Sequence, residues 1–273
     1  LRFVYYTEAS IKDIIGTAPT NVAVTVNKAA VTRQSAYWHH ALDVTNSATA
    51  AYPQVEIAAV YNPAGTNDPD VVSSVTGHVF AAKTPEVFTY DEDGNMTSDG
   101  RFTNTWNAEN RMIQVETLSS LPAMVPRVRI KYAYDFLGRR ISKEVSVQES
   151  GTWNLKSENH FAYDGWNLIQ RSEICHLQSE IRTNESSFVW GLDLSQTLQG
   201  AGGVGGLVYG SFGGTNSVWS TGYAYDGNGN VSELVSTNGT LLAHYEYSPF
   251  GDTVVASGSM ADVNPFRFST KYW

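Results

Sequence analysis

The sequence has little charge, a single cysteine and no long apolar run. Charged residues make up 16% of the 273 positions, below the quarter that is usual for globular proteins. Cys175 stands alone, which excludes an intrachain disulfide framework and a cysteine-based zinc site. Because no apolar run approaches the roughly 18 residues that a membrane-spanning helix needs, we expect no membrane span.

Basic residues are also scarce. The 18 lysines and arginines stand against 27 aspartates and glutamates, which gives a formal net charge of −9. An acidic chain without a basic run is a poor candidate for binding nucleic acid, so no nucleic-acid partner is expected. The first residues, LRFVYYTEASIKD, lack the basic start and apolar run of a signal peptide. We interpret both ends of the sequence as cuts through a longer chain.

Aromatic residues and glycines are abundant instead. Aromatic residues account for 12% of the chain, and glycine occupies 23 positions. This composition is typical of β-proteins. The nearest approach to helical spacing is a short segment around Thr7–Ile15. Alternating segments predict strands at Asn21–Val26, Gln54–Val60 and Val72–Ala82. We therefore expect an all-β fold that opens with a small β-module over residues 1–84.

A pattern recurs from about residue 85 onwards: aromatic-x-aromatic-Asp, a glycine shortly afterwards, and then a polar-apolar alternation. Its copies are FTYDEDGNM (88–96), YAYDFLGRRI (132–141), FAYDGWNLI (161–169) and YAYDGNGNV (223–231). A weaker copy, YEYSPFGDTV (245–254), has Ser248 in place of the aspartate, and half-matches with tryptophan occupy 105–116 and 188–195. The copies are separated by roughly 20 to 35 residues, a period typical of stacked structural repeats.

Each copy predicts one β-hairpin. Two aromatic residues separated by one position lie on the same face of a strand. The aspartate can accept hydrogen bonds from backbone N–H groups ahead of it, and a nearby glycine adopts positive φ at no steric cost. One hairpin cannot bury its aromatic face alone, so we expect adjacent hairpins to pair into a continuous sheet.

The segment YDEDGNMTSDGRFTNTWNAENRMIQVE (90–116) closely resembles the YD repeat of the bacterial RHS (rearrangement hotspot) family. That repeat reads Tyr-Asp-x-x-Gly-Asn and continues with Trp-Asp-x-Glu-Asn-Arg-Leu, and YDFLGRRI and YDGNGNVSELV repeat its first part. The end of the sequence, residues 245–273, resembles the start of the RHS-repeat-associated core segment. The positions that define the repeat are Tyr90, Asp91, Gly94, Asn95, Trp106, Glu109, Asn110, Arg111, Tyr134, Asp135, Gly138, Arg139, Tyr163, Asp164, Tyr225, Asp226, Gly229, Asn230, Tyr247 and Gly251.

The resemblance implies a curved, spiralling sheet of consecutive antiparallel hairpins that forms part of a shell. It divides the chain into the β-module at 1–84, the YD/RHS repeats at 85–244 and a truncated core segment at 245–273. It also implies a secreted or cell-surface, non-enzymatic protein that packages or presents a toxin-like C-terminal domain. The partner is then the remainder of its own polypeptide, including a variable C-terminal domain, and no catalytic residue, cofactor or metal is expected.

Two alternative functions stay open. Exposed tyrosine and tryptophan rings can stack on sugars, so the second hypothesis is an adhesion module that binds carbohydrate or cell-surface glycans. Its stacking residues would be Trp106, Trp166 and Trp190, although cross-strand packing is the simpler interpretation of these rings. The third hypothesis is a hydrolase with paired carboxylates, but most of the acidic residues fall in predicted turns or on solvent-facing strand positions.

Two motifs resemble ligand sites without the context that such sites need. The Asp-x-Asn-x-Asn run from Asp226 has the spacing of a calcium loop, but Val231 and Thr237 occupy the places of the required glycine and glutamate. Residues 200–205 match G-x-G-x-x-G, but a Gly-rich segment follows in place of a helix. We interpret the first motif as a turn and the second as backbone that bends sharply or packs closely.

Overall fold

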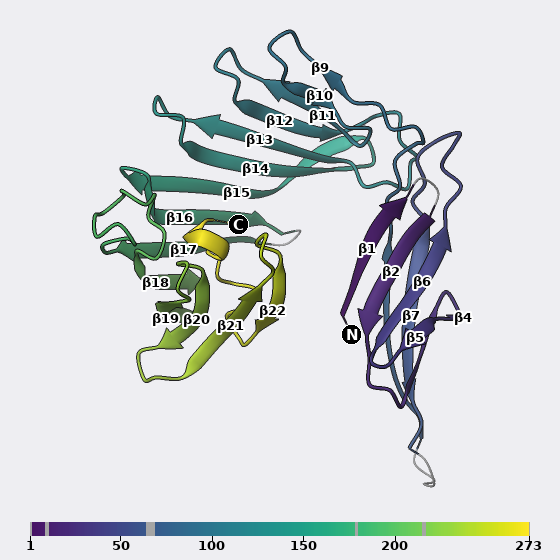
Figure 1. Cartoon of the computed structure of the whole chain (residues 1–273). Helices are drawn as coiled ribbons and strands as arrows, with labels where there is room; N and C mark the ends of the chain where they lie inside the picture. The colour runs from purple at the N-terminus through teal and green to yellow at the C-terminus, as the bar shows by residue number, and fades with distance from the viewer. Residues whose placement is uncertain (1, 9–10, 64–68, 178–179, 215–216, 273) are drawn as a thin grey trace. The chain divides into compact units, whose positions relative to one another are not determined.

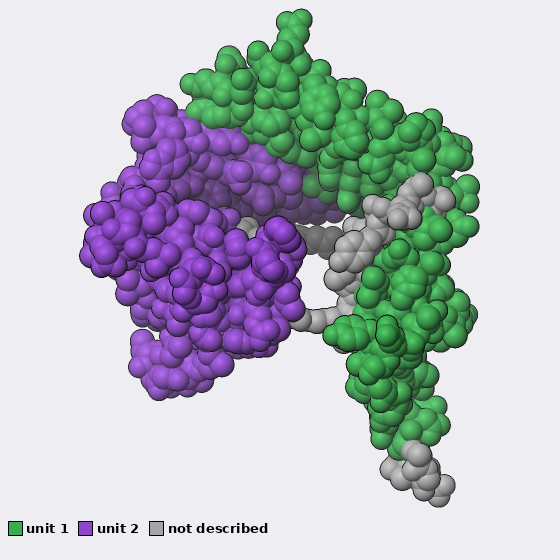
Figure 2. Space-filling view, in the orientation of Figure 1, with its two compact units in different colours: residues 1–128 green, residues 129–273 purple. Residues whose placement is uncertain are grey.

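The computed structural model describes residues 2–8, 11–63, 69–177, 180–214 and 217–272. It consists of antiparallel β-strands and one short 3-10 helix, which confirms the predicted all-β fold of consecutive hairpins (Figure 1). The chain forms two compact units, residues 1–128 and residues 129–273 (Figure 2). Within the described part of the chain, no helix has the length and apolar character needed to cross a membrane.

Unit 1 opens with two four-stranded antiparallel sheets that share an apolar core. Their strand orders are β1-β2-β6-β5 and β4-β3-β7-β8. The strands are β1 (Arg2–Glu8), β2 (Ile11–Thr17), β3 (Val22–Val26), β4 (Ala29–Ala30), β5 (Thr32–Gln34), β6 (Tyr37–Asp43), β7 (Gln54–Tyr61) and β8 (Val71–His78). Ile14 and Trp38 of the first sheet pack in one cluster with Val26 and Ile57 of the second, and all four are at most 2% exposed.

Strand β2 lies in the segment whose spacing comes nearest to that of a helix. Lys12, Ile14 and Gly16 are buried while the residues between them are more exposed, which is the two-residue period of a strand. All seven residues of β2 pair with β1 on one side and with β6 on the other. This pairing outweighs a weak helical pattern, since a short isolated helix is marginal in water.

A 14-stranded sheet contains the repeat copies, and its strands follow one another in sequence order from β9 to β22. Short turns between successive strands favour this antiparallel order. The strands are β9 (Thr89–Tyr90), β10 (Met96–Ser98), β11 (Phe102–Trp106), β12 (Met112–Thr117), β13 (Val128–Tyr134), β14 (Arg140–Glu149), β15 (Thr152–Asp164), β16 (Asn167–His176), β17 (Ile181–Trp190), β18 (Leu207–Gly214), β19 (Ser217–Tyr225), β20 (Val231–Ser236), β21 (Leu241–Tyr247) and β22 (Thr253–Ser257).

The first repeat hairpins belong to the same compact unit as the module. The module sheets end at His78 and the long sheet starts at Thr89. A small core of Ala50, Leu121 and Val125 joins the module to the loop after β12, so unit 1 extends to residue 128. The sequence-based boundary at residue 84 stays a prediction.

In unit 2, one face of the sheet is aromatic and carries the end of the chain. The ring of Phe266 lies edge-on against Phe188 at 4.9 Å, Trp190 at 5.6 Å and Tyr223 at 6.4 Å. Figure 1 shows the yellow end of the chain, with the 3-10 helix η1 (Phe268–Thr270), lying over the strands of this unit. The C-terminal segment, residues 258–272, therefore completes the core of unit 2.

Candidate functional site

Three repeat turns are each organised by one aspartate: Asp91, Asp135 and Asp226. The Oδ1 atom of each accepts hydrogen bonds from the backbone N–H groups two and four residues later, at 2.8 to 3.1 Å. The N–H three residues later donates to the carbonyl oxygen of the aspartate at 3.0 to 3.1 Å. That third residue is a glycine with φ of 84°, 80° or 75°: Gly94, Gly138 or Gly229. Because such φ values favour glycine, the Tyr-Asp-x-x-Gly spacing encodes this turn.

The hydrogen bonds change the acidity of the three carboxylates. The side chain of Asn95 is the main cause that lowers the pKa of Asp91. Burial raises the pKa of Asp135 and Asp226, but hydrogen bonds from the following residues outweigh it, and both pKa values lie below the ordinary value. The charged carboxylate is therefore the form that holds each turn.

The weaker copy at 245–254 forms its turn with a hydroxyl group. The Oγ atom of Ser248 accepts a hydrogen bond from the backbone N–H of Asp252 at 3.1 Å. Gly251 donates to the carbonyl oxygen of Ser248 at 3.0 Å and has φ of 94°. The glycine position is thus kept where the aspartate is replaced.

The fourth residue after the aspartate ties its own turn to a second element. In unit 1, Nδ2 of Asn95 donates both to its own aspartate and to Oδ1 of Asn110 in the next repeat turn, at 3.0 Å in each case. In that next turn Asn107 replaces the aspartate, and Asn110 has φ of 56° in place of the glycine. Arg111, its fourth residue, forms an ion pair with Glu109.

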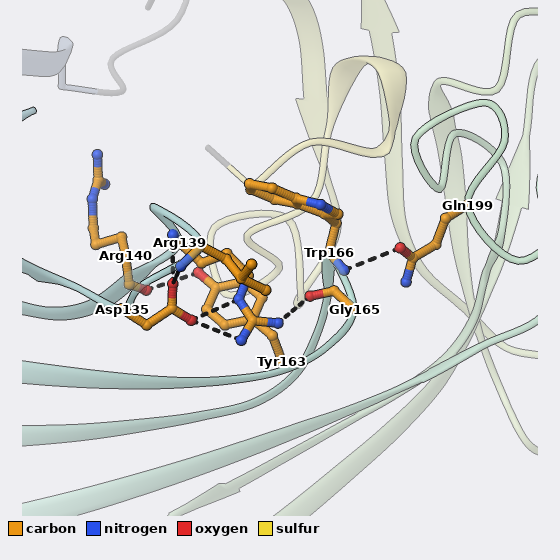
Figure 3. A network of polar contacts seen from close by, with 8 residues as sticks. Asp135, Arg139, Arg140, Tyr163, Gly165, Trp166 and Gln199 are labelled. Carbon is orange, nitrogen blue, oxygen red and sulfur yellow. Dashed lines mark hydrogen bonds and ion pairs between the residues drawn. The ribbon is translucent and has the colours of Figure 1, made fainter. Parts of the chain in front are cut away.

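Arg139 joins two neighbouring repeat turns of unit 2 (Figure 3). Its Nε atom donates to Oδ2 of Asp135 at 2.7 Å, and its guanidinium group also donates to the carbonyl oxygen of Gly165. The side chains of Arg139 and Asp135 are each 15% exposed, so water screens this ion pair less than a surface pair. The fourth position of this copy therefore connects one hairpin to the next.

The hairpin that follows has a different turn. It reverses within two residues, Gly165 and Trp166, because Asp164 pairs with Asn167. Gln199 holds the turn from outside: its Nε2 donates to the carbonyl oxygen of Asp164 at 3.0 Å, and its Oε1 accepts from the N–H of Trp166 at 3.1 Å. A Cβ atom at Gly165 would lie 2.3 Å from Nε2 of Gln199, so the glycine makes room for this clamp.

The second ring of the aromatic pair donates a hydrogen bond to the preceding strand in five places. The donor is a tyrosine hydroxyl or an indole N–H, and the acceptor is a backbone carbonyl oxygen near the start of that strand. The pairs are Trp106 with Met96 (2.9 Å), Tyr163 with Arg140 (2.9 Å), Trp190 with Leu168 (2.7 Å), Tyr225 with Leu207, and Tyr247 with Val231 (2.8 Å). At each of these rings the pairing with the next strand shifts register, which increases the local bend of the strand.

Burial keeps the tyrosine donors protonated. It raises the pKa of Tyr163, Tyr225 and Tyr247 above the ordinary value. Their hydroxyl groups therefore remain donors throughout the physiological pH range. Of the other two repeat tyrosines, Tyr90 is 60% exposed on β9 and Tyr134 is half-buried at the end of β13.

Sequence reasoning misses Asp193, which is 2% exposed and lies in the half-match FVWGLDLS. Its Oδ1 accepts from the N–H and the hydroxyl of Ser195 at 2.9 and 2.6 Å, and its Oδ2 accepts from the N–H groups of Ala201 and Gly203 at 2.7 and 3.1 Å. Burial raises its pKa, but these hydrogen bonds outweigh burial and lower the pKa to about 2. The sequence signal that could have identified Asp193 is an acidic residue that lies between apolar neighbours and precedes a Gly-rich run. The G-x-G-x-x-G match is the loop that this carboxylate folds.

Asn264 fixes the C-terminal segment to the aromatic face. It is 2% exposed, and its Oδ1 accepts a hydrogen bond from the hydroxyl of Tyr223 at 2.8 Å. Its Nδ2 donates to the carbonyl oxygen of Phe266 at 2.6 Å. Arg267, in the same segment, lies 4.3 Å above the ring of Tyr245.

Thr270 connects the C-terminal segment to a repeat turn and to the Gly-rich loop. Its hydroxyl donates to the carbonyl oxygen of Gly229 and accepts from the N–H of Gly205, both at 2.8 Å. In the same repeat turn, Oδ1 of Asn230 accepts from the N–H of Ser269 at 2.8 Å. The fourth position of this copy thus binds the end of the chain.

The three tryptophans predicted to stack on glycans have different surroundings. Trp106 and Trp190 are half-buried, and their indole N–H groups donate to backbone carbonyls. Trp166 is 63% exposed at the tip of its hairpin. Glycan stacking stays a prediction, and it is most accessible at Trp166.

No family model matches the chain. The tRNA3(Ser)-specific nuclease WapA of Bacillus spizizenii is 27% identical over 190 residues, which are 67% of this chain and 6% of that protein. The tRNA nuclease WapA of Bacillus subtilis (strain 168) is 26% identical over 186 residues, with the same two coverages of 67% and 6%. The tRNA(Glu)-specific nuclease WapA of Bacillus subtilis subsp. natto is 39% identical over 83 residues, which are 30% of this chain and 3% of that protein.

Among solved structures, the chain is similar to one from the Photorhabdus luminescens Tc holotoxin pore with a mutation in TccC3. The TM-score is 0.52 at 13% identity, and the match covers 96% of this chain and 12% of that chain. The fold, with its repeated rings and turns, is therefore that of an RHS-like β-sheet protein. The three proteins named above that are similar to it in sequence are WapA nucleases, and the chain spans 6% or less of their length.

The names of these relatives contradict the expectation that the protein is not an enzyme. Each of the three is named as a tRNA nuclease. The expectation was drawn from the resemblance of the repeats to the RHS family, and the segment that matches is at most 6% of each relative. Such a segment is no guide to the activity of a whole protein.

Proposed function

We propose that this chain is a segment of the repeat wall of a longer RHS-type toxin protein with nuclease activity. Residues 85–244 are the YD/RHS repeats, and residues 245–273 begin the core segment. The wall packages or presents a toxin-like C-terminal domain at or beyond the cell surface. The names of the WapA relatives support the nuclease class, and the likeness to the Tc holotoxin pore supports the fold of the wall.

The observation that carries this proposal is the repeated connection between neighbouring hairpins. A ring at the end of one strand donates to the start of the strand before it at five places. The residue four positions after the turn aspartate reaches a second element at Asn95, Arg139 and Asn230. The ring contacts and those of Asn95 and Arg139 run along the sheet, so they stabilise a long wall whatever its number of repeats. Asn230 instead holds the C-terminal segment.

The full-length protein tests both parts of the proposal. The full-length protein and its separated C-terminal region are each incubated with tRNA, and limited proteolysis follows the C-terminal region in both. We expect the C-terminal region to cleave tRNA and to resist protease longer within the full-length protein than alone. Intact tRNA in all reactions would refute the nuclease part, and equal protease sensitivity would refute packaging.

A pair of variants connects the protection to the wall. Arg139→Ala removes the connection between two hairpins, so we expect earlier proteolysis of the C-terminal region. Phe136→Ala is the matched control, because Phe136 lies in the same turn and is 89% exposed. Equal protection in both variants would show that the connection does not support the wall.

A further inference from the structure

A cavity of about 240 Å³ opens on the aromatic face of unit 2, beside the two-residue turn that carries Trp166. Its lining comes from the strands β14 to β17, the Gly-rich loop and the C-terminal segment. Half of the residues in the wall are aromatic, among them Tyr163, Trp166, Trp190 and Tyr272.

The ring wall is fixed in place by contacts on its outer side. The hydroxyl of Tyr163 and the indole N–H of Trp190 donate hydrogen bonds to backbone carbonyl oxygens. Tyr272 packs edge-on against Phe161 at 5.6 Å. Trp166 is held through its backbone by the neighbouring clamp, and Figure 3 shows its indole standing apart from the ring of Tyr163. A rigid turn thus presents a large, 63% exposed ring at the edge of the cavity.

Two cations line the same cavity, Arg140 and Lys271, and none of its described lining residues carries a carboxylate. Nζ of Lys271 donates to the carbonyl oxygen of Gly202 at 2.7 Å, which leaves two of its three N–H donors for a ligand. The guanidinium of Arg140 lies 4.4 Å from the centre of the Tyr132 ring, and a stacked guanidinium keeps its N–H donors in its own plane. The carboxylate of the adjoining turn, Asp135, is paired with Arg139.

We propose that this cavity binds a small ligand made of a planar ring with one anionic group. The ring stacks on Trp166 and Tyr163, since aromatic side chains accept any flat π-face. Arg140 and Lys271 hold the anionic group through charge-assisted hydrogen bonds. A nucleoside monophosphate and an aryl carboxylate share this chemistry, and the proposal is independent of the nuclease assignment.

Titration calorimetry on the full chain tests the site with AMP and indole-3-acetate. We expect saturable binding of at least one of them, and the probe that binds tells whether the anionic group is a phosphate or a carboxylate. For AMP, adenosine supplies the ring without the anion, and ribose 5-phosphate supplies the anion without the aromatic ring. Each is expected to bind at least about tenfold more weakly than AMP.

Variants assign the binding to this cavity. Trp166→Ala and Arg140→Gln are each expected to weaken binding about tenfold, and Trp166→Phe to restore most of it. Trp219→Ala is the matched control, because Trp219 is a 48% exposed indole on β19 outside the cavity. The proposal is overturned by no binding of either probe at millimolar concentration, by adenosine or ribose 5-phosphate binding as tightly as AMP, or by unchanged binding to Trp166→Ala.

Discussion

Replacing Asn264 by alanine is expected to release the C-terminal segment from the aromatic face of unit 2. The amide lies at the centre of a buried cluster: its Oδ1 accepts from the Tyr223 hydroxyl at 2.8 Å and from the N–H of Phe266 at 3.2 Å. Its Nδ2 donates to the carbonyl oxygen of Phe266 at 2.6 Å. Alanine leaves these three groups without that partner in a site where Asn264 is 2% exposed.

The size of the effect follows from burial. A buried polar group that loses its partner costs about 1–3 kcal/mol, and three such groups in one cluster give a destabilisation of about 3–5 kcal/mol once their overlap is allowed for. Urea denaturation followed by circular dichroism measures the free energy of unfolding. Asn228→Ala is the matched control, because Asn228 is exposed at a turn tip and only its backbone N–H contacts the turn aspartate. A loss below about 1 kcal/mol in Asn264→Ala would refute the reasoning.

Three further predictions concern single side chains. Asp193 has its pKa lowered to about 2, so its contribution to stability is complete above its ordinary pKa near 4 and is lost as the pH falls towards 2; Asp193→Asn should flatten the acid limb of a plot of stability against pH. Hydrogen bonding to Glu246 raises the pKa of His244, so its contribution is present below about pH 6.5 and is lost as the pH rises through the raised pKa; His244→Gln should remove that loss. Tyr163→Phe removes one hydroxyl-to-carbonyl hydrogen bond to Arg140 and should lower the free energy of unfolding by about 1 kcal/mol.

Each of these predictions has a result that contradicts it. An unchanged acid limb in Asp193→Asn would mean that the carboxylate does not hold its loop in the charged form. A stability of His244→Gln that still falls by the wild-type amount as the pH rises above about 6.5 would assign that loss to other groups. Tyr90→Phe is the control for Tyr163→Phe, since Tyr90 is 60% exposed, and equal effects of the two substitutions would remove the special role of the inner ring.

Local spacing was enough to predict the hairpins. Tyr223 and Tyr225 lie two positions apart on one strand, and Gly229 lies three positions after Asp226 in the turn that follows. Both spacings are set by the backbone of a single hairpin, so a short stretch of sequence is enough to predict it. The same logic explains the strands at Val22–Val26 and Gln54–Tyr61. Where the physical cause is local, the sequence pattern and the structure agree.

Contacts between distant residues were beyond the same reasoning. The turn at Gly165 and Trp166 depends on Gln199, more than 30 positions away, so the repeat pattern alone does not reveal its two-residue length. Asp193 folds a Gly-rich loop through the backbone N–H groups of residues 8 and 10 positions later, and its position between apolar residues ahead of that loop only hints at these contacts. Residues that meet across a sheet are set by its register and curvature, and these emerge only when all the hairpins are assembled.

The segment with weak helical spacing forms strands for a related reason. Ile11–Thr17 gains backbone pairing with two neighbouring strands, a tertiary effect that a single segment does not reveal. The same distinction applies to the candidate site. The exposure of the Trp166 ring follows from its local turn and could be predicted. Its proximity to Lys271 could not, because Lys271 belongs to a chain segment about 100 positions away.

Electron cryo-microscopy of the full-length protein tests the central claim most directly, because it shows the wall and the C-terminal domain together. The account predicts a continuous sheet of sequential hairpins, with the C-terminal segment on its aromatic face and the toxin-like domain enclosed by the wall. A C-terminal domain lying outside an open sheet, with residues 258–272 detached from the rings of unit 2, would contradict it.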